Sequence, residues 1–411
     1  MGRFDSQTFN VGERLKPPAT AGNRTQSGGV PRAVDVGIVG AGFIGLSIGW
    51  RLALAGLSVA VFDRGEAGAG SSLASTGMLA AAAEHESGGD DLLALARESQ
   101  EQWPDFRSAL ETQSGMSIDY RSEGTLVVAL ARDEVERLRF RFDMQRRAGL
   151  DTQWLNGAEA RALEPSLRGS VAAGVFCPGD HQVDPRLMSP ALAQAFIAHG
   201  GRLFENTEVL SFERTAGRAS GLVTASGACQ AKTIIIATGV WAADTLAPLG
   251  LNIPVRPLKG QALALRANRQ TGNLKRIVWT EQIHLAPKSD GRLIVGATVE
   301  DMGFNATITA GGALALLEGV HRALPSSEEM EIEAIWSGFR PTSDDDAPIL
   351  GSVDIPGLLI ATGHHRNGVL LAPATARAFE DLLLHGQMKG AANRFGLTRF
   401  NRIDAAQGGA R

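Results

Sequence analysis

The segment Gly40-Ala-Gly-Phe-Ile-Gly45 constrains this chain more than any other part of its sequence. It follows a short apolar stretch at 35–39 and opens a segment whose apolar residues recur at helical spacing. A strand that runs through glycines into a helix is the context of a dinucleotide-binding turn. Gly40 permits the tight turn, Gly42 lets the backbone approach a pyrophosphate, and Gly45 allows the helix to pack closely on the strand. The pyrophosphate then accepts hydrogen bonds from free N–H groups at the start of the helix.

A second expected strand, 57–63, ends in Asp63. A carboxylate about twenty residues after the glycines accepts the ribose hydroxyls of a dinucleotide. The next loop, 65–77, is rich in glycine and hydroxyl side chains and could follow a longer ligand from its pyrophosphate to its ring. Two alternatives stay open: an ordinary glycine-rich turn at 40–45, and a mobile surface linker at 65–77.

Near-continuous apolar strands are expected at 35–39, 233–237 and 358–362, a pattern typical of strands buried on both faces of a parallel sheet. Alternating segments at 258–265 and 283–295 predict antiparallel strands between them. We therefore expect an α/β fold (α+β overall), in which a Rossmann-like nucleotide-binding domain is interleaved with an antiparallel-sheet substrate domain. The expected bounds are 34–86, 162–247 and 336–390 for the first domain and 87–161 and 248–335 for the second, with a disordered extension at 1–33 and a tail at 391–411.

Composition excludes several classes of partner. The chain has 40 basic and 44 acidic residues, a net charge of −4, so neither nucleic acid nor an anionic membrane is an expected partner. No apolar stretch is long enough to span a bilayer, and the first 33 residues lack the apolar core of a signal peptide. Cys177 and Cys229 form no zinc or CxxC spacing, and the histidines form no metal set. We expect a cytoplasmic protein without a metal.

Several motifs carry a resemblance to a known family. The segments 35–78, Thr233–Trp241 and Pro257-Leu-Lys-Gly-Gln261 together resemble the D-amino-acid-oxidase-like flavoprotein superfamily. Within it, Gly338-Phe-Arg-Pro341 and the run 361–373 are most similar to glycine oxidases. The resemblance implies non-covalent FAD as cofactor, a small amino acid or amine as substrate, and a connection with thiamine biosynthesis. It leaves a homo-oligomer open.

The resemblance also places residues around FAD. Those that match contacts to the ADP half are Gly40, Gly42, Phe43, Ile44, Gly45, Asp63, Arg64 and Val209. Those that match positions near the ribityl chain and the ring, or that belong to the strand motif, are Ser71, Ser72, Thr76, Gly77, Met78 and Gly239. Those that match positions on the pyrimidine side of the flavin are His364, His365, Arg366, Asn367, Gly368, Val369 and Leu370. A helix that begins near Asn367 would also aim its positive end at a reduced flavin. A plain helix capped by Asn367 is compatible with that role.

Four residues are expected at the substrate: Arg340, Arg366, His284 and Met78. An arginine grips a carboxylate with two parallel hydrogen bonds, and Arg340 lies in the motif 338–341, where the resemblance implies carboxylate binding. The alternative is an arginine on the surface. Arg366 matches a second position near substrate and flavin.

The chain departs from glycine oxidases at two substrate-facing positions. His284 stands where the resemblance implies a tyrosine, and Gln282 stands where it implies a histidine. His284 is expected either to contact the substrate or to face solvent from a strand, and substrate identity is open at this point. Neither cysteine matches a known attachment position for covalent flavin, so the FAD is expected to be non-covalent.

The implied reaction is oxidative deamination of glycine, sarcosine or a similar amine, by hydride transfer to flavin N5. Molecular oxygen is the expected acceptor and hydrogen peroxide the expected product. Two alternatives remain: a D-amino-acid or amine dehydrogenase that passes electrons to a quinone or carrier, and a non-catalytic nucleotide-binding module.

Overall fold

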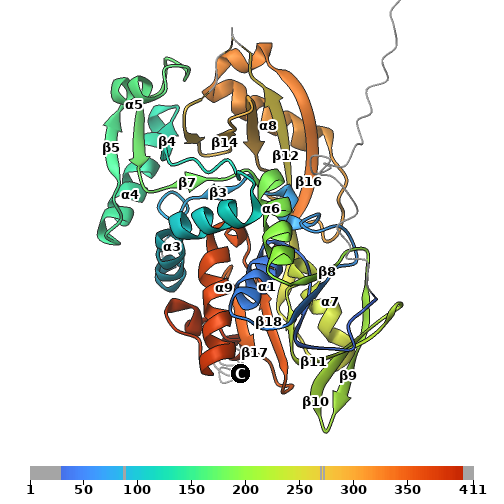
Figure 1. Cartoon of the computed structure of the whole chain (residues 1–411). Helices are drawn as coiled ribbons and strands as arrows, with labels where there is room; N and C mark the ends of the chain where they lie inside the picture. Colours follow the sequence, from blue (N-terminus) through green and yellow to red (C-terminus); the bar gives the residue numbers. More distant parts are fainter. Residues whose placement is uncertain (1–28, 87–88, 269–270, 272–273, 401–411) are drawn as a thin grey trace, which may run out of the picture.

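The computed structural model describes residues 29–86, 89–268, 271 and 274–400. Most of the expected extension at 1–33, and the part of the expected tail beyond residue 400, lie outside these ranges. Two eight-stranded sheets form the molecule, one in its lower half and one in its upper half as drawn (Figure 1).

The first sheet is built around the predicted β-α-β unit. Its path runs β17 (Ile349–Ser352), β18 (Leu358–Thr362), β11 (Gly227–Ile236), β1 (Ala33–Val39), β2 (Val59–Phe62) and β8 (Arg202–Phe204). The five strands from β18 to β8 are parallel, whereas β17 is antiparallel to β18. A hairpin of β9 (Val209–Thr215) and β10 (Arg218–Thr224) joins the sheet through antiparallel pairing of β10 with β11. Strands far apart in the sequence therefore lie side by side, as expected from three apolar segments that suit burial on both faces.

Long helices cover one face of this sheet. They are α1 (Phe43–Leu54), α3 (Asp90–Ser114), α6 (Pro185–Ala198) and α9 (Gly368–His385), and they pack against one another (Figure 1). Their buried side chains form one apolar core with Val36 and Ile38 of β1, while Val34 and Val39 point into the core on the other face. Ile38 and Val39 are neighbours in β1 and therefore point to opposite faces, so this one strand contributes to both cores.

The second sheet is almost wholly antiparallel. Its order is β16 (Glu331–Ser343), β12 (Val255–Arg266), β15 (Arg292–Gly296), β14 (His284–Pro287), β13 (Ile277–Trp279), β4 (Thr125–Ala129), β6 (Ala173–Cys177) and β5 (Gln153–Asn156). Only the β13–β4 pair is parallel among these described strands. Leu263 and Leu265 of β12 face a core with α8 (Ala310–Ala323), whereas Ala262 and Ala264 face the opposite core.

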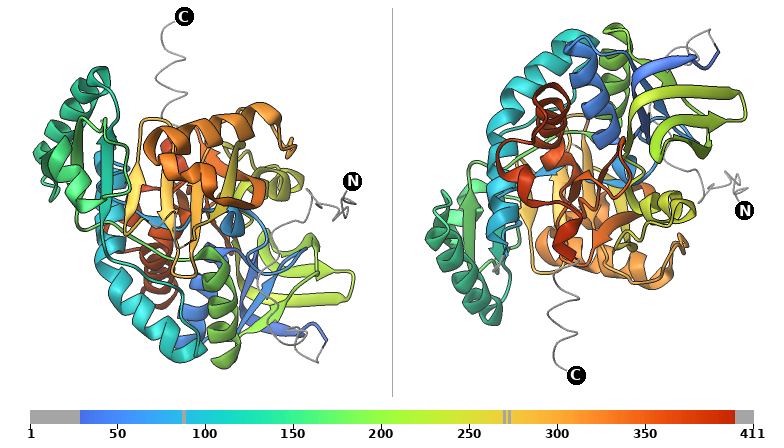
Figure 2. Two further views of the ribbon diagram at one scale, coloured as in Figure 1. Left: turned by 90° about the horizontal axis from the view of Figure 1, so that it is seen from above. Right: turned by 90° about the horizontal axis from the view of Figure 1, so that it is seen from below.

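The remaining helices are short or peripheral. Helices α4 (Arg132–Arg147) and α5 (Gly157–Leu163) flank β5 at one edge, as two views of the ribbon show (Figure 2). Helices α2 (Ser71–Ala74) and α7 (Ala242–Leu246) lie in connections, and β3 (Met78–Leu79) pairs with β7 (His181–Gln182).

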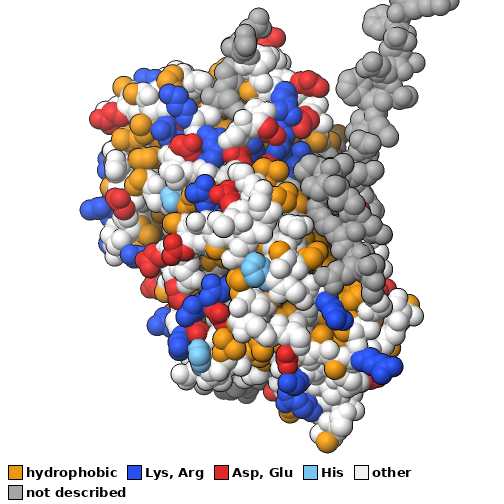
Figure 3. All heavy atoms as spheres, viewed as in Figure 1, with side chains coloured by type: hydrophobic (Ala, Val, Ile, Leu, Met, Phe, Trp, Pro, Cys, Tyr) orange, Lys and Arg blue, Asp and Glu red, His pale blue; other side chains and the backbone are white. Residues whose placement is uncertain are grey.

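The mixed α/β architecture confirms the predicted fold class. The domain bounds stay a prediction. Sheet membership bears on them, because β6 and the last part of β16 pair within the second sheet, although residues 173–177 and 336–343 were predicted to belong to the nucleotide-binding domain. On the face shown in Figure 3, acidic and basic side chains are interspersed, as a net charge of −4 suggests. No helix among the described residues combines the length and apolarity needed to cross a membrane.

Candidate active site

A cavity of about 880 Å³ lies where the two sheets meet. Strands β1 and β2 contribute its nucleotide-binding end, and β12, β14 and β16 contribute the opposite end. Most of the residues predicted from the sequence line it, among them Gly40, Gly42, Phe43, Ile44, Asp63, Arg64, Ser71, Ser72, Thr76, Gly77, Met78, Val209, Gly239, His284, Arg340, His364, His365, Arg366, Gly368 and Val369.

The three glycines of the turn at 40–45 each have a different structural role. Gly40 has φ +108°, and a Cβ there would lie 2.4 Å from the carbonyl oxygen of Ala237. A Cβ on Gly45 would lie 2.0 Å from the carbonyl oxygen of Gly40, so the helix could not approach the turn. At Gly42 a Cβ would meet only the Ser72 hydroxyl, at 3.1 Å. Gly40 and Gly45 are therefore required by backbone packing, whereas Gly42 keeps backbone open to the cavity.

Asp63 connects the second strand to this turn. Its carboxylate accepts hydrogen bonds from the backbone N–H of Ala41, at 2.7 Å, and of Gly65, at 2.9 Å. Burial raises the pKa of the Asp63 carboxyl, and the two backbone donors oppose that shift. Asp63 thus fixes the loop in addition to lining the cavity, a structural role that the sequence did not suggest.

The glycine-rich loop at 65–77 contacts both α1 and β16, which line opposite ends of the cavity. The Ser72 hydroxyl accepts a hydrogen bond from the N–H of Phe43, at 2.9 Å, at the start of α1. The Ser71 hydroxyl donates to the carbonyl of Phe339, at 2.6 Å, in β16. These contacts exclude the alternative of a mobile surface linker at 65–77.

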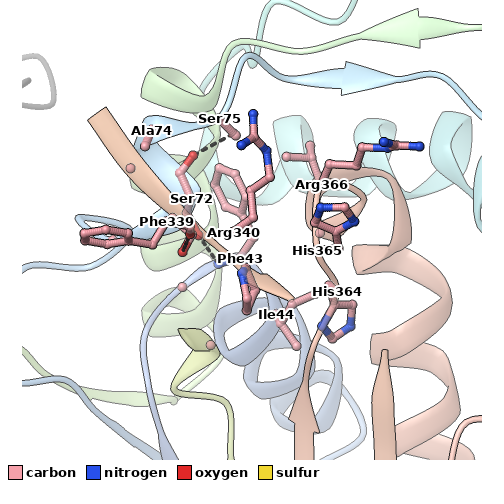
Figure 4. A pocket seen from close by; sticks show the side chains of 18 of the residues that line it. Phe43, Ile44, Ser72, Ala74, Ser75, Phe339, Arg340, His364, His365 and Arg366 are labelled. Carbon is pink, nitrogen blue, oxygen red and sulfur yellow. Dashed lines mark hydrogen bonds between the residues drawn. The ribbon is translucent and has the colours of Figure 1, made fainter. Parts of the chain in front are cut away.

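Arg340 of β16 lines the cavity, with Ser72 and Ser75 on one side of it and His365 and Arg366 on the other (Figure 4). Its Nη1 donates to the backbone carbonyls of Lys259, at 3.3 Å, and Thr298, at 3.2 Å. Within the described part of the chain, its guanidinium has no carboxylate at ion-pair distance, and Nη2 and Nε have no hydrogen-bond partner. Burial and Arg366 lower the pKa of Arg340, and Glu84 and Glu300 raise it. An arginine remains charged under such shifts, so the cavity holds a cation that is available to an anion.

His284 lines the cavity rather than facing solvent. Its Nε2 lies 3.0 Å from the Thr76 hydroxyl, and its ring lies over Gly296, where a Cβ would be 2.4 Å from Nε2. Burial, with help from Arg340 and Lys288, lowers the pKa of His284 to about 3. The imidazole is therefore neutral near pH 7 and exchanges one hydrogen bond with a hydroxyl group.

Arg366 reaches the cavity wall but is already paired. Its Nε donates to Glu84, at 2.9 Å, and its Nη2 to Glu86, at 2.5 Å. Burial alone would lower the pKa of Arg366, but the two carboxylates outweigh burial and raise it. Its side chain extends away from Arg340 (Figure 4). The expected second substrate-binding arginine is therefore neutralised in this structure.

Three predicted residues do not line the cavity. Gly45 supports the turn from within α1, as above. Asn367 is the N-cap residue of α9, but its side chain makes no capping hydrogen bond. Leu370 is buried, and its carbonyl accepts hydrogen bonds from Ser99, at 2.6 Å, and Trp103, at 2.9 Å. Leu370 anchors α9 to α3.

Sequence reasoning missed several lining residues: Glu84, Trp241, Trp279, Val299 and Phe339. Trp241 and Phe339 lie inside the motifs at 233–241 and 338–341, so these two residues could have been predicted from the sequence. Arg64 lies over the Trp241 ring, 4.4 Å from its centroid, at the nucleotide end. Glu84 carries no signal, because it lies in an alanine-rich turn without a motif.

The family model of the FAD-dependent oxidoreductases (DAO) matches residues 35–382. The chain belongs to this family. The recognition made from the sequence is thereby confirmed, and the cofactor of this oxidoreductase is FAD. The chain is therefore an enzyme, and the alternative of a non-catalytic nucleotide-binding module is wrong.

Individual relatives agree with the family. The glycine oxidase of Geobacillus kaustophilus is 36% identical over 368 residues, which cover 89% of this chain and 97% of that protein. Its crystal structure superposes with a TM-score of 0.84, at 35% identity, over 90% of this chain and 99% of that one. The bifunctional protein ThiO/ThiG of Trichormus variabilis is 34% identical over 90% of this chain and 55% of its own length. The iminodiacetate oxidase of Chelativorans sp. BNC1 has a TM-score of 0.80 at 28% identity, over 88% of this chain and 98% of that one.

The cavity fits FAD. Its nucleotide end offers open backbone at Gly42, the positive end of the α1 dipole, and Asp63 beside Arg64. The hydroxyl-rich loop at 71–76 continues from there toward Arg340 and His284. A long ligand can therefore lie from the glycine turn to the substrate end.

Proposed function

We propose that this FAD-dependent oxidoreductase oxidises the C–N bond of glycine, sarcosine or a similar small amino acid, with oxygen as acceptor and hydrogen peroxide as product. The observation that carries the proposal is Arg340 of β16, which lines the cavity and whose guanidinium has no carboxylate partner among the described residues. Similarity to glycine oxidases over nearly the whole length of those proteins supports the substrate class.

The cavity-lining side chains have different roles in binding the substrate. Arg340 holds the substrate carboxylate with Nη2 and Nε, the nitrogen atoms that have no partner in the described residues. FAD, when bound, accepts the hydride from the substrate carbon. His284 is neutral and does not repel an amine, and Met78 and Trp279 supply apolar walls that exclude water. We further propose that the FAD is non-covalent and is held by the cavity-lining residues named above from 40–44, 63–64, 71–78, 209, 239, 364–366 and 368–369.

A second candidate substrate is an amine with a second carboxylate. Gln282 stands in place of the histidine and His284 in place of the tyrosine that the resemblance implies, and both line the cavity. An iminodiacetate oxidase shares the fold at 28% identity, which supports this alternative. Similarity to a ThiO/ThiG protein supports a role in thiamine biosynthesis. Two free, buried cysteines agree with a reducing, cytoplasmic location.

An anaerobic panel of amines tests the substrate and the acceptor together. Bleaching of the bound flavin by glycine or sarcosine, followed by rapid recovery when oxygen is admitted, is expected. Bleaching without rapid recovery would indicate a dehydrogenase, and bleaching by iminodiacetate alone would indicate the second candidate.

The Arg340→Ala variant tests the carboxylate site separately. Loss of a charge-assisted bidentate contact should lower kcat/KM by about 30–1000-fold, or roughly 2–4 kcal/mol, while FAD content stays that of the wild type. Wild-type kinetics in this variant would place the carboxylate elsewhere.

A further inference from the structure

Backbone from two segments holds Arg340 in place. The carbonyls of Lys259 in β12 and of Thr298 accept its two hydrogen bonds. Lys259 and Glu300 exchange backbone hydrogen bonds of 2.9 Å in both directions, so residues 298–300 run alongside β12. The position of the guanidinium therefore depends on how these two segments are joined.

Buried polar side chains join them. The Lys259 side chain is 1% exposed, and its Nζ donates to Glu300, at 3.0 Å, and to the carbonyl of Thr307, at 2.5 Å. The other oxygen of Glu300 accepts from Gln261, at 2.7 Å, and from the Thr298 hydroxyl, at 2.5 Å. Lys259 and Gln261 belong to the motif at 257–261, which had no assigned role.

Glu300 lies two residues after Thr298, whose carbonyl accepts a hydrogen bond from Arg340. Burial by itself raises the pKa of Glu300, but its donors Thr298, Gln261 and Lys259 outweigh burial and lower the pKa. The negative charge of Glu300 acts on Arg340 and raises the pKa of that guanidinium. An anion at this place competes with the substrate carboxylate for Arg340 unless its own charge is balanced.

We propose that Lys259 is a positioning residue: its ion pair with Glu300 keeps that carboxylate away from Arg340, so the guanidinium stays available to the substrate carboxylate. The inference rests on the proposed role of Arg340. It assigns a function to a buried lysine that does not touch the substrate. It also explains why a fully buried ammonium group is kept, since a buried ion pair by itself contributes little to stability.

A charge-rescue experiment tests the proposal in the FAD-loaded protein. Acetate serves as the carboxylate probe, and its binding is followed by the change in the visible absorbance of the flavin. Lys259→Met leaves Glu300 without its cation, so the Kd of acetate should rise about tenfold, and the KM for the amine should rise more than kcat falls. Glu300→Gln should leave the Kd within about threefold of wild type or lower it, because the competing charge is gone.

The double variant Lys259→Met/Glu300→Gln is decisive. It should bind acetate within about threefold of wild type, because neither charge remains. If both single variants and the double variant weaken acetate binding alike, the network is only a structural support and the proposal is wrong. Should Lys259→Met fail to fold, the double variant still decides, since a tenfold loss there would overturn the proposal.

Two controls separate this inference from the proposed function. Lys232→Met removes a lysine that pairs with Asp35, at 2.7 Å, on the exposed surface, and should leave acetate binding unchanged. Arg340→Ala should abolish acetate binding. If it does while Lys259→Met binds acetate like wild type, only the present inference fails. If Arg340→Ala binds acetate normally, the proposed carboxylate site fails first.

Discussion

Replacing Gly260 by alanine tests the position of Arg340 without touching its charge. Gly260 lies in β12 between Lys259 and Gln261, opposite Gly338 of β16. A Cβ at residue 260 would lie 2.7 Å from both Nη1 and Nη2 of Arg340 and 2.9 Å from its Cζ. The guanidinium therefore occupies the space that a side chain at residue 260 would fill.

The size of the effect follows from these distances. The optimal separation of non-bonded heavy atoms is about 3.5 Å, so the guanidinium must move by about 0.8 Å. It is the end of a flexible side chain and can move, but its hydrogen bonds to Lys259 and Thr298 would lengthen. A displacement near 1 Å at a substrate-positioning group costs about 100-fold in rate. We expect kcat/KM for glycine or sarcosine to fall about 10–100-fold, equivalent to about 1.4–2.7 kcal/mol.

The assay compares steady-state peroxide formation with thermal stability. Gly260 has no positive φ, so the Tm should change little, because the strand tolerates alanine. Gly311→Ala is the matched control: a Cβ there meets nothing within 4 Å, and its kinetics should equal those of wild type. Wild-type kcat/KM in Gly260→Ala would refute the reasoning, because Arg340 would then not bind the carboxylate from the position described.

Further predictions concern the nucleotide end and the buried charges. Asp63→Ala should weaken FAD binding by about 1.5–3 kcal/mol, measured by FAD titration of apoprotein, because the carboxylate supports the turn and faces the ligand; unchanged affinity would contradict this. Gly45→Ala should lower FAD content and Tm together, since its Cβ would lie 2.0 Å from the rigid carbonyl of Gly40; a wild-type Tm would exclude the packing argument. Burial lowers the pKa of Lys288 to about 8, so the unfolded state binds more protons between about pH 8 and 10.5 and stability gains from rising pH in that window. The free energy of unfolding lost in Lys288→Met should therefore grow from pH 8 to 10.5, and a constant difference would count against a depressed pKa. Because the pKa of His284 is about 3, His284→Asn should change the magnitude of kcat/KM but not the shape of its profile between pH 5 and 8; loss of an inflection there would show that His284 titrates.

Several features were predictable because they depend on short stretches of sequence. The turn at 40–45 follows from local rules, since glycine spacing, a preceding apolar strand and a following helical period all lie within one segment. The ends of β18 and α9 were also close to expectation, with α9 beginning one residue after Asn367. Burial on both faces produces uninterrupted apolar runs, which explains why β1, β11 and β18 were recognised as members of one parallel sheet.

Other features depend on contacts between residues distant in sequence. The two partners of Arg366 lie 280 and 282 positions away, so no local pattern could reveal that this cation is neutralised. His284 could face either side of its strand, and only the pairing of β14 with β15 directs it toward Thr76.

The sequence by itself determined the nucleotide-binding turn, the fold class and the residue types available for chemistry. Tertiary structure decided which charges cancel one another. Arg340 and Arg366 are the same residue type, yet among the described residues Arg340 donates to backbone carbonyls alone, while Arg366 pairs with Glu84 and Glu86. The physical reason is that a charge is available for binding only when no opposite charge lies beside it, and sheet pairing and helix packing bring those partners together.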